Sequence, residues 1–290
     1  MTSVLYENSG LLLSHAKLQL IMNRRSIING DFLNSKLDIS DPIESNEAYV
    51  KLLGILEGGM VHYSLEGKIY SILPNKGPKP FVGFQAILKG VWQPLPNNTY
   101  SYSLFEVGFF ADLETGIPIK KFVNPITSAE NNLIRIKGGP HVSVIKPHIY
   151  SWVVIGDDIW IEESKTLNGY FGSSEKLNKN DNAENAKEIA FFNRIYRGRL
   201  SELNNGAARA FCQMHYNYIS PWYPFFNMEN IEGKMYWQAV GTKIDSFSEV
   251  PEKMQNFLLA EHQEFFDSEQ PWTKATSTLA EYRRIQNGKG

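Results

Sequence analysis

The sequence has few of the features that stabilise small secreted proteins or anchor a chain in a membrane. Only one of its 290 residues is a cysteine, Cys212, so no disulfide bond can form within the chain. No stretch approaches the roughly 20 consecutive apolar residues that span a bilayer, and the apolar run at residues 11–13 is too short for a secretory signal. These absences predict a cytoplasmic protein without a membrane span.

Signatures for cofactors, metals and nucleic acids are also missing. The chain has no glycine-rich dinucleotide or phosphate motif and no nucleophile elbow. Its six histidines form neither of the metal-binding motifs HxH and HExxH. The net charge of −2 provides no excess of basic residues that would attract a polyanion. We therefore expect no cofactor, no bound metal and no nucleic-acid partner, while a homodimer stays open.

Aromatic residues, in contrast, are abundant at 13% of the sequence, which favours β-strands and apolar binding sites. Strand-like segments separated by turn signals recur along the chain, and Gly58-Gly59 has the character of a hairpin turn. The segments are 50–57, 60–65, 68–73, 81–92, 100–111, 117–123, 132–137, 142–145, 149–155, 159–162, 189–200, 209–219 and 234–243. This pattern predicts a mainly β protein, an antiparallel barrel that is lipocalin-like or a related closed sheet.

Helical spacing of apolar residues is confined to the two ends of the chain. It predicts a short N-terminal helix over residues 10–25 and a C-terminal helix over 251–267. We expect residues 1–47 to form a helical or irregular extension and residues 48–290 to form the barrel with its C-terminal helix, as a single domain overall. The polar segment 172–187 is expected to be a solvated loop.

The strand over residues 100–111 supplies the first candidate for chemistry, Glu106. Alternation along a strand places Tyr102 and Glu106 on one face, among aromatic residues, and neither face has a solvent-like composition. A carboxyl group buried there would have a raised pKa and could act as a general acid or base near neutral pH. Alternatively, Glu106 pairs with an arginine such as Arg135 and only orders the fold.

A second candidate, His148, shares a strand face with Tyr150 and Trp152 if Pro147 does not shift the register. An imidazole in an aromatic-lined pocket could move a proton near pH 7. The alternative is a hydrogen-bonded histidine near a strand end, without a role in chemistry. The predicted catalytic residues are therefore Glu106, His148 and Tyr102, and Tyr150 and Trp152 are predicted to bind substrate.

A polar stripe and an aromatic segment complete the predicted site. Gln213, His215 and Asn217 share one strand face, which is either a solvent face or a set of groups that position a substrate carbonyl. Trp222 lies in the proline-rich segment 220–226, which is either a preformed pocket wall or a core plug. The two alternatives for each remain open at this point.

We predict that these residues meet around one internal cavity. Glu106, Tyr102 and His148 are expected to line it, because a barrel interior brings together faces of separate strands. His215 and Trp222 are expected to lie near its mouth.

Several short motifs in a fixed order resemble one protein family. They are EVGFFAD at 106–112, TG at 115–116, NPIT at 124–127, DIWI at 158–161, SPWYPFF at 220–226, GTK at 241–243, PWT at 271–273 and YRR at 282–284. In these motifs the chain is similar, over roughly residues 48–285, to the family catalogued as domain of unknown function 1838. The resemblance implies a mostly antiparallel β fold and a setting among enzymes of specialised metabolism. It assigns no catalytic residue.

The function predicted from these observations is a cofactor-independent enzyme of specialised (secondary) metabolism, in natural product biosynthesis. It would convert an apolar aromatic or acyl-derived small molecule by acid–base chemistry, as an isomerase, cyclase or lyase that forms an enolate. One alternative is a non-catalytic carrier of a hydrophobic small molecule, which needs the same pocket. Another is a protein interaction module that uses the 172–187 segment.

Overall fold

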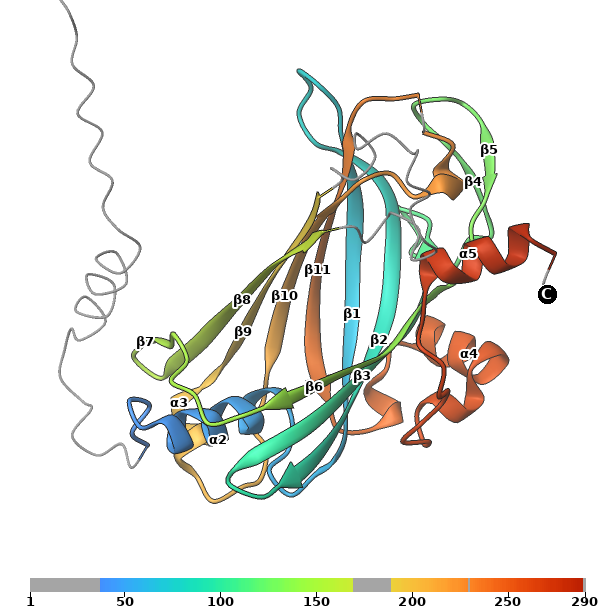
Figure 1. Ribbon diagram of the computed structural model, residues 1–290. Coiled ribbons are helices and arrows are strands. Elements are labelled where there is room, and N and C mark those ends of the chain that lie inside the picture. The colour runs from blue at the N-terminus through green and yellow to red at the C-terminus, as the bar shows by residue number, and fades with distance from the viewer. Residues whose placement is uncertain (1–36, 169–188, 229, 289–290) are drawn as a thin grey trace, which may run out of the picture.

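The computed structural model of the chain describes residues 37–168, 189–228 and 230–288 (Figure 1). The helix predicted over 10–25 and the loop predicted over 172–187 lie outside these residues.

An antiparallel sheet of ten strands forms the body of the molecule, in the order β12-β6-β3-β2-β1-β11-β10-β9-β8-β7. Its strands are β1 (Gly59–Ile72), β2 (Lys79–Leu95), β3 (Thr99–Ala111), β6 (Ile136–Ile145), β7 (Val153–Ile155), β8 (Asp158–Asn168), β9 (Ile189–Arg199), β10 (Gln213–Ser220), β11 (Lys234–Ile244) and β12 (Thr276–Ser277). A separate two-stranded ribbon contains β4 (Lys121–Val123) and β5 (Glu130–Asn132). The predicted mainly β, antiparallel architecture is confirmed, but across the described residues the sheet is not closed into a barrel.

Helices cover the sheet and its ends. They are α2 (Pro42–Leu53), α3 (Leu200–Asn204), α4 (Glu252–Glu261) and α5 (Thr278–Gln286), with 3-10 turns η3 (Pro224–Phe226), η4 (Phe247–Glu249) and η5 (Gln263–Phe265). The helix predicted over 251–267 corresponds to α4 followed by η5. None of the described helices is long and apolar enough to cross a membrane.

The prediction of a strand over residues 50–57 is wrong, because helix α2 occupies the first half of this segment and a turn the rest. Its start is encoded at Asp41, whose carboxylate accepts hydrogen bonds from the amides of Ile43 and Glu44, while Pro42 suits the first helical turn. The sequence pair Asp41-Pro42 is therefore a helix start and not a turn between extended segments. The boundary predicted between residues 47 and 48 falls inside α2.

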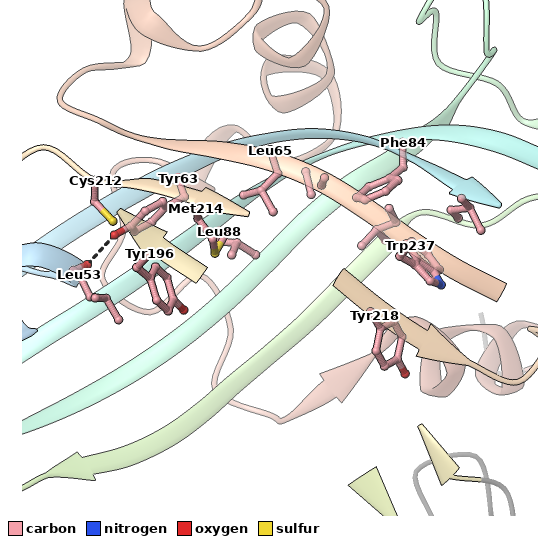
Figure 2. Packing of buried hydrophobic residues seen from close by; sticks show 14 of the residues in the cluster. Leu53, Tyr63, Leu65, Phe84, Leu88, Tyr196, Cys212, Met214, Tyr218 and Trp237 are labelled. Carbon is pink, nitrogen blue, oxygen red and sulfur yellow. Dashed lines mark hydrogen bonds between the residues drawn. The ribbon is translucent and has the colours of Figure 1, made fainter. Parts of the chain in front are cut away.

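The sheet curls, and its two faces carry separate cores (Figure 1). On the concave face, side chains from neighbouring strands pack in a continuous row. Tyr63 and Met214 lie together toward one end of this row, and Trp237 packs with Phe84 and Tyr218 further along it, as Figure 2 shows. On the convex face, residues of β2 and β3 pack against α4 and η5 through Phe109, Phe257 and others. Because both faces are covered, the centre of β2 is buried at every position from 81 to 92.

The concave face is covered at both ends and less completely in the middle. At one end lies α2, whose Leu52 and Val50 are fully buried (Figure 1). At the other end η3 inserts Phe226, which is also fully buried and contacts Phe81 and Phe122 edge to face. Between these ends several concave-face side chains, including those of β3 and β9, keep part of their surface exposed.

Candidate functional site

A small cavity opens in the middle of the concave face, next to α2. Its volume is about 20 Å³, enough for about one water molecule. The residues that line it come from α2 and five strands, and most of them are apolar: Leu53, Val61, Tyr63, Leu88, Gly90, Tyr102, Leu104, Arg194, Tyr196 and Met214. A larger ligand would therefore have to lie over the cavity, on the concave face.

Glu106 and His141 converge beside this cavity, above Gly138. Glu106 on β3 is directly opposite Gly138 on β6, and an added Cβ at Gly138 would lie 3.2 Å from Glu106 Oε2 and 3.9 Å from His141 Nε2. Burial raises the pKa of Glu106, and the charge of Arg194 only partly offsets this. Although His141 as a residue is exposed, partial burial of its imidazole lowers its pKa, and the charges of Arg194 and Lys165 lower it further. A carboxyl group biased toward its protonated form thus lies near an imidazole biased toward its neutral form.

Arg194 on β9 faces this pair from the other arm of the curled sheet. Four strands separate β9 from β3 in the sheet order, yet Arg194 acts electrostatically on both Glu106 and Tyr102. Its guanidinium group lies over the rings of Phe192 and Tyr216, at 4.8 and 5.6 Å from their centres. No carboxylate lies within 4.0 Å of this group among the described residues, and its buried Nε has no hydrogen-bond partner there.

Tyrosine hydroxyl groups and one further carboxylate surround these charges. Glu163 on β8 is the cross-strand neighbour of Arg194, but its carboxylate accepts hydrogen bonds from the hydroxyl groups of Tyr49 and Tyr196 instead. Burial raises the pKa of Tyr49, Tyr196 and Tyr102. All three hydroxyl groups stay protonated near neutral pH. Those of Tyr49 and Tyr196 donate to Glu163, whereas that of Tyr102 can donate a hydrogen bond to an anionic oxygen of a ligand.

Tyr102 and Glu106 occupy the positions that strand parity predicted, on the same face of β3. Tyr102 lines the cavity and packs on Trp92 with 4.5 Å between ring centres, while Glu106 lies next to it, outside the cavity lining. Arg135, the alternative partner considered for Glu106, instead donates to the carboxylate of Glu261, with Nε 2.8 Å from Oε2.

His148, Tyr150 and Trp152 do not reach the cavity lining, because the segment that carries them precedes β7 and is not a strand. The segment packs along α2. His148 is exposed, and its ring is perpendicular to that of Tyr150, with 5.1 Å between centres. Tyr150 stacks on Tyr49 at 4.2 Å, and Trp152 Nε1 donates to Ser45 Oγ at 2.9 Å. The structure thus separates His148 from Glu106 and Tyr102.

Gln213, His215 and Asn217 lie on the convex side of β10, because Met214 and Tyr218, between them in alternation, face the concave core. His215 is exposed, and Asn217 Oδ1 accepts a hydrogen bond from Tyr236 Oη at 2.7 Å. This is the arrangement of a solvent face. The prediction that His215 lies at the mouth of the cavity does not match its position.

Trp222 lies at the far end of the sheet from α2, where its indole Nε1 donates to the carbonyl of Ile231 at 3.0 Å. The segment that follows it forms η3, and Asn124 Nδ2 donates to the carbonyl of Phe226 at 2.8 Å. Of the two alternatives for residues 220–226, the core plug describes the observed packing, and Trp222 is not among the residues that line the cavity.

Two central residues of the site, His141 and Arg194, were missed by the sequence analysis. A register shift between Leu104 and Glu106 in the β3–β6 pairing places His141 opposite Leu104, and strand alternation alone does not predict such a bulge. Arg194 lies inside a segment that was predicted to be a strand. Alternation places it between Phe192 and Tyr196 on one strand face, and a cation on such an aromatic face was a signal for a functional residue.

Comparison with known families agrees with the resemblance in the motifs. The family described as "Protein of unknown function (DUF1838)" matches residues 58–284. The chain belongs to this family. No curated protein matches the chain. The matched DUF1838 region contains Glu106, His141 and Arg194, together with all the strands that carry them. Within the described residues of this DUF1838 member, no three His, Cys, Asp or Glu side chains cluster in a way that could hold a metal ion.

Proposed function

We propose that the concave face is the active site of a cofactor-independent enzyme that moves a proton on a small apolar molecule, aromatic or acyl-derived, in specialised metabolism. The observation that carries this proposal is the convergence of Glu106 and His141 above Gly138, opposite Arg194 and on the same face of β3 as Tyr102. Proton donors and acceptors with shifted pKa values, set in an apolar surface, are typical of acid–base active sites.

The proposed step begins with removal of a proton from a carbon next to a carbonyl group. The carboxylate form of Glu106 takes this proton, and the electron pair of the carbon–hydrogen bond moves to the carbonyl oxygen to form an enolate. The hydroxyl group of Tyr102 donates a hydrogen bond to this oxygen, and the positive charge of Arg194 stabilises the enolate through space. Return of the proton to another carbon gives an isomer, whereas attack of the enolate on a second carbonyl carbon gives a cyclised product.

The burial of Glu106 supports the role of a base, because a raised pKa makes the carboxylate a stronger proton acceptor. His141, with a lowered pKa, is largely neutral near pH 7, so its imidazole can accept a hydrogen bond from the protonated form of Glu106. The apolar lining formed by Leu53, Leu104 and Met214 would hold the carbon skeleton. Because the cavity itself is small, the reacting molecule would lie across the concave face and insert at most a small group.

The apolar lining would also suit the alternative, a carrier of a hydrophobic compound. A carrier, however, gains nothing from a carboxyl group and an imidazole held next to each other. The polar members of the cluster therefore favour the enzyme.

Glu106→Gln tests the proposal, with Glu66→Gln as the matched control, because Glu66 is an exposed glutamate on strand β1 of the same sheet. Host cells that carry each variant or a deletion are compared by mass spectrometry of small molecules. We expect the deletion and Glu106→Gln to accumulate the same compound, and Glu66→Gln to match the wild type.

The accumulated compound is then incubated with purified protein in D2O. The wild-type protein should convert it, or exchange its acidic carbon-bound hydrogen, about 10²- to 10⁴-fold faster than Glu106→Gln. Equal rates for both proteins would contradict the role of Glu106. Tight binding of the compound without conversion or exchange would support the carrier.

A further inference from the structure

The guanidinium group of Arg194 is held in place by aromatic rings and not by acceptors. It lies over Phe192, two residues earlier on β9, and over Tyr216, its cross-strand neighbour on β10. Contacts with ring faces fix the plane of the group and leave the N–H groups at its edge directed away from the rings. Arginine is the residue that most readily binds a planar anion through two parallel hydrogen bonds.

The chain supplies no anion at that edge within the described residues. Glu163, directly opposite on β8, accepts hydrogen bonds from Tyr49 and Tyr196. Glu106 acts on Arg194 only through space, without a hydrogen bond or an ion pair between them. Burying a guanidinium group without acceptors costs free energy, so a protein that keeps one there needs it for something other than the fold.

The charges around Arg194 also favour an anion. Lys165 on β8 shares the concave face with Arg194, since it pairs with Phe192 in register. Glu163 is the nearby carboxylate, and Glu106 is shifted toward its neutral form by burial. His141 is shifted toward its neutral form as well and adds no positive charge. The site thus sets the basic side chains of Arg194 and Lys165 against Glu163 and against Glu106, whose carboxyl group burial shifts toward the neutral form.

An apolar wall begins directly beside the guanidinium group. Arg194 is the charged residue in the cavity lining, and the tyrosines supply its polar hydroxyl groups. The remaining lining residues are apolar: Leu53, Val61, Leu88, Gly90, Leu104 and Met214. One edge of the site is therefore cationic and the adjoining surface is apolar, which matches a molecule with an anionic head and an apolar body.

We propose that the ligand of the concave face is an amphipathic carboxylate, with its carboxylate group bound by Arg194 and its apolar part against the cavity wall. This inference rests on the proposed small-molecule site and adds the chemical class of its ligand. Arg194 binds and orients the ligand, so that a carbon close to the carboxylate faces Glu106 across the face.

Binding of simple probes tests the inference without knowledge of the natural ligand. The probes are 4-phenylbutanoate, octanoate and the corresponding neutral amides, measured by titration calorimetry with the full chain. The variants are Arg194→Met and Arg194→Lys, and the matched control is Arg197→Met, since Arg197 lies on the same strand, is exposed and pairs with Asp158. Thermal unfolding of each variant verifies that it is folded.

The wild-type protein should bind at least one carboxylate with a millimolar or lower Kd, about tenfold or more tightly than its amide. Arg194→Met should abolish this preference, Arg194→Lys should keep part of it, and Arg197→Met should keep all of it. Equal affinity for acid and amide, a preference that survives in Arg194→Met, or no binding of either carboxylate would overturn the inference.

The same titration on Glu106→Gln separates this inference from the proposed function. Carboxylate binding that is retained in Glu106→Gln is expected, because the two residues have different roles. If binding depends on Arg194 while Glu106→Gln still catalyses proton exchange at the wild-type rate, the ligand class stands and the acid–base mechanism falls.

Discussion

The two faces of the sheet bury charged side chains in different ways. On the convex face, Lys89 is fully buried, but its amino group donates to the carbonyl of Ser268 and lies 4.6 Å from the centre of the Phe265 ring. On the concave face, Arg194 has aromatic neighbours but no acceptor for its Nε. The charge on the convex face is satisfied by the chain itself and belongs to the fold, whereas the charge on the concave face is available to a ligand.

A histidine on each face shows the same difference in access: His62 is enclosed by the fold, whereas His141 can reach solvent or a ligand. On the convex face, His62 is buried, and its ring stacks on Phe266 at 3.9 Å, so that burial lowers its pKa to about 3. It therefore stays neutral at any ordinary pH. His141 stays exposed at the rim of the concave face, next to Glu106, where it can exchange protons with solvent or a ligand. On the concave face, the shifted pKa of His141 is therefore combined with access to solvent.

The largest effect is expected from Phe265→Ala, which would break the convex core. Phe265 is fully buried in η5, stacks on Trp272 and lies over Lys89. Loss of such a ring costs about 3–5 kcal/mol of unfolding free energy, because it leaves a cavity. Chemical denaturation should show this loss. A loss below about 1 kcal/mol would show that η5 is not part of the folded core.

The second-largest loss of stability is expected from Lys243→Met, because the amino group of Lys243 on the concave side has hydrogen-bond partners within the chain. Its buried amino group donates to the carbonyls of Lys51, Leu52 and Gly54 at the end of α2, at 3.1, 2.7 and 3.2 Å. Lys243→Met would leave these carbonyls without their donor, at a cost of about 1–3 kcal/mol. The exposed Lys234 on the same strand is the control, and Lys234→Met should leave the denaturation midpoint unchanged. Equal midpoints for both variants would contradict the anchoring of α2 by Lys243.

Arg194→Met sharpens the comparison, because its effect on stability should be small or of opposite sign. The substitution removes a buried cation that has no acceptor and leaves an apolar side chain among Phe192 and Tyr216. We expect the melting temperature to stay equal or rise, with a gain of up to about 2 kcal/mol. A clear fall in melting temperature would mean that Arg194 is a structural residue like Lys89.

The smallest effect is a pH dependence from Glu106. Its pKa is raised in the folded state, so above the ordinary carboxyl value of 4.5 the folded protein binds more protons at this site than the unfolded chain. The contribution of Glu106 to stability is therefore present at low pH and declines as pH rises from 4.5 through the raised pKa of the folded state. Glu106→Gln removes this decline. Melting temperatures between about pH 4 and 8 should fall less steeply for Glu106→Gln than for the wild type, with Glu66→Gln unchanged.

Strand alternation was sufficient to predict the half of the site that lies on one regular strand. Tyr102 and Glu106 share a face because β3 is continuous from Thr99 to Ala111. The same argument failed for His148, because residues 146–152 form no strand. It also missed His141, since a bulge in the β3–β6 pairing changes the register there. Side chains that meet across a curled sheet, such as Arg194 and Glu106, depend on curvature that a strand pattern does not encode.

Helix α2 shows a second limit of the sequence patterns. Residues 50–57 were predicted to pair with the following segment as a hairpin around Gly58-Gly59. The capping signal at Asp41 and Pro42 was stronger evidence for a helix than the apolar run was for a strand. The error mattered for the site, because α2 covers one end of the concave face and contributes Leu53 to the cavity.

The protonation of Glu106 is the most direct test of the account. Carbon-13 NMR of side-chain carboxyl groups, with Glu106→Gln to assign the signal, gives the titration midpoint of Glu106 in the wild type and in Arg194→Met. The account predicts a midpoint above 4.5 in the wild type and a still higher one in Arg194→Met, because Arg194 stabilises the carboxylate form. A wild-type midpoint at or below 4.5, unchanged in Arg194→Met, would contradict an acid–base site on the concave face.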